Sequence, residues 1–295
     1  MLCNACPFEC NVDRSVKLGR CRASDTIEIA QAQLHHWEEP PISGTRGSGT
    51  IFFTHCNLSC KFCQNYDISQ LGYGHKVTPE RLLAIMLELE RRGAHNINLV
   101  TPTHYTRQLI PILEKARQRL KIPILWNSNA YEKVATLRLL SGLVAIYLPD
   151  LKYFSDEIAR NFSSAPNYFQ HASQAILEMK RQVGENIYDK NGIIQKGLII
   201  RHLVLPGQTE DSKKILTWIK ENLGPDTHIS LMAQYYPTYR ANELEGMNRR
   251  LRPSEYQEVY RHFLELGFKQ GYCQELSSAS PDYTPDFEGK GIEQI

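Results

Sequence analysis

The sequence predicts an α/β protein built as a partial (βα)6 TIM-like barrel with a cysteine-rich N-terminal extension. Short apolar segments rich in β-branched residues alternate with segments whose apolar residues recur at helical spacing, which is typical of parallel βα units. The strand segments are apolar on successive residues, as expected for strands buried on both faces. Six such units are too few for a full barrel, so an open doubly wound sheet is the alternative.

The elements can be placed in order along the chain. Residues 27–41 contain one short predicted strand. The first helix begins at Thr78, a good N-cap, with Pro79 in its first position, and Gly93 suits its end. The segment 189–192, Asp-Lys-Asn-Gly, predicts the turn of a small hairpin. The other predicted strands are 50–54, 96–100, 122–126, 143–148, 197–205 and 228–232, and the predicted helices are 78–93, 109–116, 131–140, 156–162, 172–183, 212–223 and 254–266.

Composition excludes several classes of protein. The 295 residues are 42% hydrophobic and 22% charged, so the chain can bury a core and is not intrinsically disordered. The net charge of +2 gives no reason to expect a nucleic-acid partner. The sequence has no apolar stretch as long as a membrane span, and its start lacks the basic flank and apolar core of a signal peptide. We therefore expect a cytoplasmic protein with no membrane partner.

The cysteines are the most informative residues, because seven of the eight lie in the first 63 positions. Cys56, Cys60 and Cys63 form a C-x3-C-x2-C triplet directly after the first barrel strand, at the catalytic end of a barrel-like fold. Three such closely spaced thiolates suit a [4Fe–4S] cubane, in which each binds one iron and the fourth iron stays open. A structural zinc corner is the alternative.

The triplet, with Phe62 before the last cysteine, resembles the C-x3-C-x-aromatic-C signature of the radical S-adenosylmethionine (radical SAM) superfamily. The string Cys63-Gln-Asn65-Tyr-Asp67 is similar to the Cys-His-Asn-x-Asp string of the pyruvate formate-lyase activating enzymes. Asp150-Leu-Lys152 resembles the Asp-x-Lys motif by which those activases hold SAM. The wider pattern, through 96–105 and 201–207, is similar to an uncharacterised activase-like subfamily.

This resemblance implies a partial barrel of the radical SAM type over residues 46–295, ending in a C-terminal helix, after an extension over 1–45. It implies that the open iron chelates SAM and that one electron, from a flavodoxin- or ferredoxin-type donor, cleaves SAM to methionine and a 5′-deoxyadenosyl radical. The radical would abstract hydrogen from a glycine of a partner glycyl-radical enzyme. A small molecule or a peptide is the alternative substrate. The hypotheses from other classes are a non-catalytic iron–sulfur or zinc protein and a methylating enzyme.

The resemblance also implies the site residues. Cys56, Cys60 and Cys63 would bind the cluster and act in catalysis. Where the superfamily usually carries a Gly-Gly-Glu-like motif, this chain has Thr101-Pro-Thr103-His, whose hydroxyls and carbonyls can accept from an ammonium. Polar residues at the strand ends, among them Asn129 and Gln234, face the expected mouth of the fold. The predicted cofactor-binding residues are Phe62, Asn65, Thr101, Thr103, Asn127, Asp150, Lys152 and His202.

A second metal site is predicted in the extension, where Cys3, Cys6, Cys10 and Cys21 supply four thiolates. They could bind a structural zinc or complete a second [4Fe–4S] cluster, and the crowding of the first three favours iron–sulfur. Disulfides are the alternative, which a reducing cytosol disfavours. The remaining Cys273 is expected to be a buried, small apolar side chain, and His35 and His36 are expected at the surface.

Overall fold

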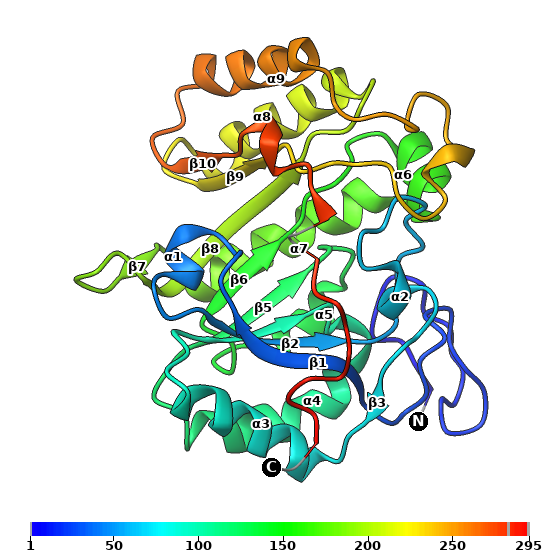
Figure 1. The fold of residues 1–295 in the computed structure, drawn as a ribbon, viewed down its shortest axis with the longest axis vertical. Helices are drawn as coiled ribbons and strands as arrows, with labels where there is room; N and C mark the ends of the chain where they lie inside the picture. The colour runs from blue at the N-terminus through cyan, green and yellow to red at the C-terminus, as the bar shows by residue number, and fades with distance from the viewer. Residues whose placement is uncertain (1, 282–283, 294–295) are drawn as a thin grey trace.

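The computed structural model describes residues 2–281 and 284–293, and its centre is a curved, mostly parallel sheet (Figure 1). The barrel strands neighbour one another in chain order and are all parallel, with no point at which the order reverses. A doubly wound sheet would reverse, so the partial (βα)6 barrel is confirmed. These strands are β2 (Ser48–Phe53), β4 (Ile97–Val100), β5 (Ile124–Ser128), β6 (Ile146–Pro149), β8 (Ile194–Leu203) and β9 (His228–Met232).

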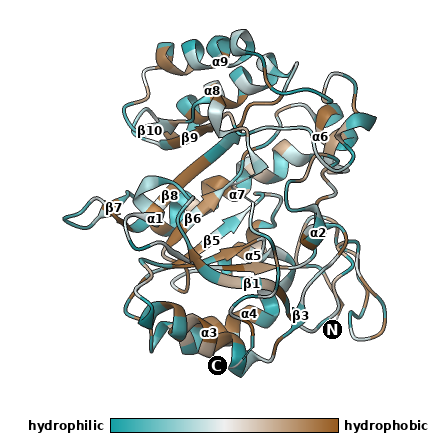
Figure 2. Ribbon diagram, viewed as in Figure 1, coloured by the Kyte–Doolittle hydropathy of each residue, from teal (hydrophilic) through white to brown (hydrophobic). Residues whose placement is uncertain are grey.

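Helices cover the outside of this sheet, with α3 and α4 near one end and α8 and α9 near the other (Figure 1). The helix α3 has both features that its sequence predicted. The Thr78 side chain caps it by accepting a hydrogen bond from the amide of Arg81 at 3.1 Å, and the apolar residues at helical spacing, Leu82, Met86 and Leu89, are buried. Figure 2 shows apolar residues gathered on the strands and on helix faces that meet them. The longer helices are α3 (Pro79–Arg91), α4 (Thr106–Arg117), α6 (Asp156–Ser163), α7 (Tyr168–Val183), α8 (Thr209–Leu223) and α9 (Pro253–Glu265).

The short elements lie in the connections. The helices are α1 (Pro40–Ser43), α2 (Tyr66–Ser69) and α5 (Val134–Arg138), and the 3-10 turns are η1 (Thr103–Tyr105), η2 (Ala241–Glu243) and η3 (Leu276–Ser278). The predicted hairpin is confirmed, because β7 (Ile187–Tyr188) pairs antiparallel with β8 across the turn at Asp189. Of the described helices, none is long and apolar enough to cross a membrane.

Both edges of the barrel sheet carry additional strands. The short strand predicted within 27–41 is β1 (Glu28–His35), which pairs antiparallel with β2, and β3 (His75–Lys76) pairs with β1. The sheet therefore continues into residues that the sequence analysis assigned to the extension. The domain boundary at residue 45 and the unit 46–295 stay predictions. Within that unit, residues 282–283 and 294–295 lie outside the described residues.

At the other edge, β10 (Gly271–Cys273) pairs parallel with β9 and was not predicted. Cys273 is exposed there, so the prediction of a buried side chain is wrong. The strand is only three residues long, and its residues alternate between exposed and half-buried, as is typical of an edge strand.

The described C-terminal segment 284–293 crosses the open side of the sheet towards β1 and α3 (Figure 1). The amide of Ala32 in β1 donates to the carbonyl of Lys290 at 2.9 Å, and the rings of Phe52 and Phe287 lie 5.4 Å apart. The side chain of Arg81 in α3 donates to the carbonyl of Ile292 at 2.9 Å. This segment helps to enclose the interior of the partial barrel.

Candidate active site

The cysteine triplet lies in the loop between β2 and α2, and hydroxyl and amide groups surround its sulfur atoms. The amide of Leu58 donates to Cys56 Sγ at 3.3 Å, and the Asn129 side chain donates to the same sulfur at 3.4 Å. Ser163 Oγ donates to Cys60 Sγ at 2.9 Å, and Ser69 Oγ lies 3.2 Å from Cys63 Sγ. Donors of this kind favour a thiolate over a thiol.

Burial opposes that preference. It raises the pKa of all three thiols, with that of Cys63 raised to about 11, and each thiolate would also repel its neighbours. The Lys152 ammonium lowers the pKa of each thiol by a smaller amount. Without a metal, the thiols are therefore protonated at neutral pH, and metal binding must displace their protons.

The donor set fits an iron–sulfur cluster. None of the eight cysteines forms a disulfide, so all three thiols of the loop are available as ligands. Within the described part of the chain, no three His, Cys, Asp or Glu side chains are placed to hold a single metal ion. A cluster needs a wider set, because each thiolate binds a different iron atom.

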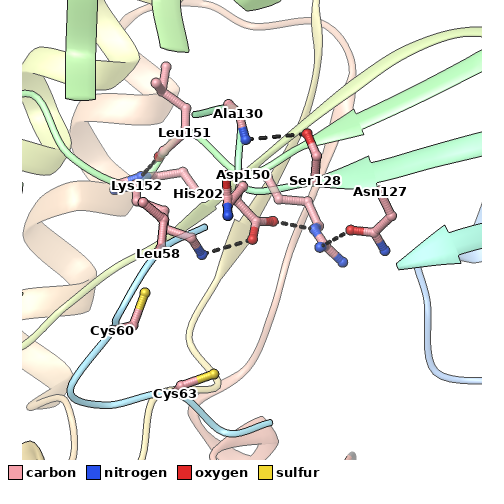
Figure 3. Close-up of polar contacts among 12 residues, drawn as sticks. Leu58, Cys60, Cys63, Asn127, Ser128, Ala130, Asp150, Leu151, Lys152 and His202 are labelled. Atoms are coloured by element: carbon pink, nitrogen blue, oxygen red, sulfur yellow. Dashed lines mark hydrogen bonds and ion pairs between the residues drawn. The ribbon is translucent and has the colours of Figure 1, made fainter. Parts of the chain in front are cut away.

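Beside the cysteines, the ends of β5, β6 and β8 carry a chain of ion pairs and hydrogen bonds (Figure 3). Lys152 Nζ lies 2.8 Å from Asp150 Oδ2, and Arg201 Nε lies 2.7 Å from Asp150 Oδ1. Arg201 Nη2 donates to Asn127 Oδ1 at 2.7 Å. Burial raises the pKa of the Asp150 carboxyl, but Arg201 and Lys152 outweigh it and hold that pKa below its usual range. Asp150 is therefore ionised at neutral pH.

These groups share one cavity of about 300 Å³. Cys60 and Cys63 line it, together with Asp150, Lys152 and Arg201. His35 also lines it and is half-buried, so the prediction of a surface position is wrong for His35, whereas His36 is exposed as predicted. Because β1 pairs with β2, the end of β1 brings His35 to the interior of the barrel.

The structure brings most predicted cofactor-binding residues to this cavity: Phe62, Asn65, Asn127, Asp150 and Lys152 all line it. The buried His202 lies outside the lining, with its two ring nitrogens 2.7 Å from the Leu151 carbonyl and 2.9 Å from Ser212 Oγ. Buried Thr103 donates to Glu132 at 2.9 Å. Thr101 follows β4 with a φ of 59°, a costly backbone conformation for a β-branched residue.

Sequence reasoning missed Glu38 and Glu39, which also line the cavity. They stand after β1, on a segment that the sequence placed outside the barrel. Glu38 Oε2 lies 3.1 Å from Arg201 Nη1, and Glu38 Oε1 accepts from Asn98 at 2.9 Å. The acidic pair before Pro40-Pro41 is only a weak signal of a buried site in the sequence, because two adjacent glutamates are usually exposed to solvent.

The four N-terminal cysteines also come together. Cys10 Sγ and Cys21 Sγ both lie within 4 Å of the position that a Cβ on Gly19 would take. Burial and, to a smaller extent, the charges of Cys21, Cys10 and Cys3 together raise the pKa of Cys6 to about 12. The ring of Phe8, in the same segment, packs edge-on at 5.3 Å against Tyr131, which follows β5.

Comparison with known proteins places this architecture in a family. The family model of the Radical SAM superfamily matches residues 50–219, more than half of the chain, and the protein belongs to this superfamily. Membership makes it an enzyme of a class that uses a [4Fe–4S] cluster and SAM.

Particular relatives were also found. The chain is 33% identical over 279 residues to the uncharacterised protein MJ0674 of Methanocaldococcus jannaschii, covering 90% of this chain and 74% of that protein. Its fold is similar to that of Streptococcus suis SuiB bound to S-adenosylmethionine, with a TM-score of 0.51 and 14% sequence identity. The match covers 77% of this chain and 50% of the SuiB chain, so this chain spans about half the length of SuiB. It is also similar to methylornithine synthase (PylB), with a TM-score of 0.50 and 16% identity, covering 80% of this chain and 74% of that one. At these identities, the two structures support the fold alone.

Proposed function

We propose that this protein cleaves SAM reductively and uses the resulting 5′-deoxyadenosyl radical to take a hydrogen atom from a substrate in the 300 Å³ cavity. The observation that carries the proposal is that two thiols of the C-x3-C-x2-C loop line the same cavity as the Asp150–Lys152 pair. A [4Fe–4S] cluster on that loop would supply one electron to the SAM sulfonium, breaking the C5′–S bond.

In this proposal, Cys56, Cys60 and Cys63 hold the cluster. Lys152, a cation beside the thiols, binds the carboxylate of SAM, and Asp150 accepts from its ribose hydroxyls. Phe62, whose ring lies 5.7 Å from that of Tyr235, offers an aromatic surface to the adenine. Asn65 and Asn127 supply amide groups at the same cavity wall.

The other predicted residues act indirectly. Both ring nitrogens of His202 form hydrogen bonds with protein atoms, one with Leu151 and one with Ser212. These bonds hold the end of β6 against α8. Thr103 orients Glu132, and Thr101 presents backbone groups at the end of β4. We propose that these three residues shape the SAM site rather than line its cavity.

The substrate is proposed from the activase resemblance: a glycine in a partner glycyl-radical enzyme, with a flavodoxin- or ferredoxin-type protein as the one-electron donor in the cytoplasm. Abstraction of the glycine Cα hydrogen yields 5′-deoxyadenosine and leaves the glycyl radical on the partner. A small molecule or a peptide is the second candidate, because a cavity of about 300 Å³ can also hold a small molecule or a side chain of a peptide.

We also propose that Cys3, Cys6, Cys10 and Cys21 hold a second metal centre, a [4Fe–4S] cluster in preference to zinc. The support is that the other three thiols all raise the pKa of Cys6 and that two of the four, Cys10 and Cys21, lie next to Gly19. Four thiolates leave no open iron, so this centre would not bind SAM.

The Cys60→Ala variant tests the proposed activity. After anaerobic reconstitution, the wild type should convert SAM to methionine and 5′-deoxyadenosine when a strong reductant is added. Cys60→Ala should lose this activity and the visible absorption of the cavity cluster, because one iron loses its protein ligand. The matched control is Cys273→Ala, which removes an exposed thiol on β10 and should retain both. Undiminished 5′-deoxyadenosine formation by Cys60→Ala, or none by the wild type, would contradict the proposal.

A further inference from the structure

Glu39 is a buried carboxyl group with an oxygen that nothing in the described part of the chain satisfies. The residue is 8% exposed, its Oε2 atom has no hydrogen-bond partner, and the residue lines the cavity. The amides of Ile42 and Ser43 donate to its carbonyl at 2.8 and 3.1 Å, so the start of α1 fixes its backbone. Buried polar groups without a partner are rare in native proteins, and one that lines a cavity is free to bind a water, an ion or a ligand there.

The cations near Glu39 are already engaged. Arg201 uses Nε for Asp150, Nη1 for Glu38 and Nη2 for Asn127. Lys152 lies 2.8 Å from Asp150. Among the described residues that line the cavity, three carboxyl groups therefore face two cations. The charge of Arg201 is felt at Glu39, but neither Arg201 nor Lys152 forms a direct ion pair with it.

The histidine at the cavity cannot supply the missing charge. Burial lowers the pKa of His35 to about 4, so its ring is neutral at physiological pH. The carboxyl of Glu39 accepts hydrogen bonds from Ser230 and from its own backbone amide, but burial still raises its pKa, and the charge of Arg201 opposes this only in part. An ionised carboxylate at this depth without a cation is costly, so the site favours an occupant that brings a positive charge.

The walls near Glu39 suit such an occupant. Tyr272 and Trp37 line the same cavity, and aromatic rings attract organic cations. Cys60 and Cys63 line it too, so a ligand bound at Glu39 would share one cavity with the proposed cluster.

We propose that Glu39 binds a positively charged nitrogen of the substrate, an alkylammonium or guanidinium group. The inference rests on the proposed function, because it takes this cavity as the place where the substrate loses its hydrogen atom. It narrows the substrate to amines and to peptides or proteins that present a lysine or arginine side chain. Glu38, whose two oxygens are used by Arg201 and Asn98, holds the network in place and does not contact the substrate.

The test is equilibrium binding of three probes of equal length: pentylamine, pentan-1-ol and pentanoate. Each is titrated calorimetrically into the reconstituted protein without reductant, so that no turnover occurs. The wild type should bind pentylamine roughly tenfold or more tightly than pentan-1-ol, the ratio expected for one charge-assisted hydrogen bond, and pentanoate most weakly. Glu39→Gln, which keeps the side-chain shape, should bind amine and alcohol equally.

The matched control is Glu185→Gln, which alters an 83% exposed side chain and should keep the amine preference. SAM carries an ammonium of its own, so the titrations are repeated with saturating SAM. Amine binding that disappears when SAM is present would assign Glu39 to SAM and overturn the proposal. Equal binding of amine and alcohol by the wild type would also overturn it, and this comparison needs no variant to fold. None of these readouts depends on SAM cleavage, so a failure of the proposed activity is recognised separately.

Discussion

Asp150 and Lys152 illustrate how single residues depend on their neighbours in this site. Burial alone would raise the pKa of Asp150 and lower that of Lys152. The two groups lie 2.8 Å apart, and each holds the pKa of the other in the direction of the charged form. Because both side chains are largely buried, with 17% and 20% exposed, this attraction is weakly screened by solvent.

At this scale we predict that Asp150→Ala and Lys152→Ala retain the cluster but bind SAM more weakly. Each variant loses a charge-assisted hydrogen bond to SAM, worth about 1.5–3 kcal/mol, so the dissociation constant should rise roughly tenfold or more. Equilibrium titration of SAM measures the change, and the absorption spectrum reports the cluster. Lys190→Ala, at an exposed turn, is the control. Wild-type affinity in both variants would show that the pair has only a structural role.

Among the elements, α9 is attached to the barrel through its first turn. Glu255 accepts from the amide of Arg252 at 2.9 Å and from the amide of Gly207, in the connection between β8 and α8, at 2.8 Å. Both terminal nitrogens of Arg249 lie 2.7 Å from its carboxyl oxygens. The ion pair with Arg249 and these amides lower the pKa of Glu255 to about 2.

We therefore predict that Glu255→Gln lowers the free energy of unfolding by about 1–3 kcal/mol at pH 7. A carboxyl whose folded pKa is depressed stabilises the fold above its unfolded pKa of 4.5 and loses that contribution as the pH falls towards about 2. Urea unfolding at several pH values should show the difference from wild type shrinking below pH 4.5. The control, Glu265→Gln, alters an exposed residue at the other end of α9. A difference that does not change with pH would contradict the ionic explanation.

At the scale of the whole molecule, the N-terminal segment is bound closely to the barrel. Arg14 is buried and donates to the carbonyls of Ala23, Ser24 and His104, the last of which lies in the barrel. The carbonyl of Tyr131, whose ring packs on Phe8, accepts from Asn57 at 2.8 Å, next to Cys56. The N-terminal segment that carries the four cysteines and the loop that carries the cysteine triplet thus contact the same residues after β5.

We predict that the variant with Cys56, Cys60 and Cys63 all changed to alanine still retains about four irons per chain, because the N-terminal thiolates hold a cluster of their own. Elemental analysis after anaerobic reconstitution measures them. About one zinc and no iron would identify a zinc site instead. Changing Cys3, Cys6, Cys10 and Cys21 to alanine in the same background should remove the remaining metal. A triple variant that binds neither metal would disprove the second centre.

Local patterns were sufficient for most of the fold. The parallel strands were predicted within a few residues because each is a short apolar run between turn residues, and the helices because their buried positions repeat at helical spacing. The edge strand β10 could not be predicted, since three residues with alternating exposure leave almost no pattern. The same reason explains the wrong expectation for Cys273.

For the site, the sequence by itself determined the cysteine triplet and the Asp150–Lys152 pair, because their spacing within a few residues reflects the chemistry directly. Only the tertiary structure decided that Glu38 and Glu39 lie inside the barrel. Glu38 contacts Arg201 from more than 150 positions away because β1 pairs with β2 and carries the chain into the cavity. The structure also showed that His202 and Thr103 are held by protein atoms outside the cavity lining. Such contacts depend on strand pairing and burial between distant segments, which no local pattern encodes.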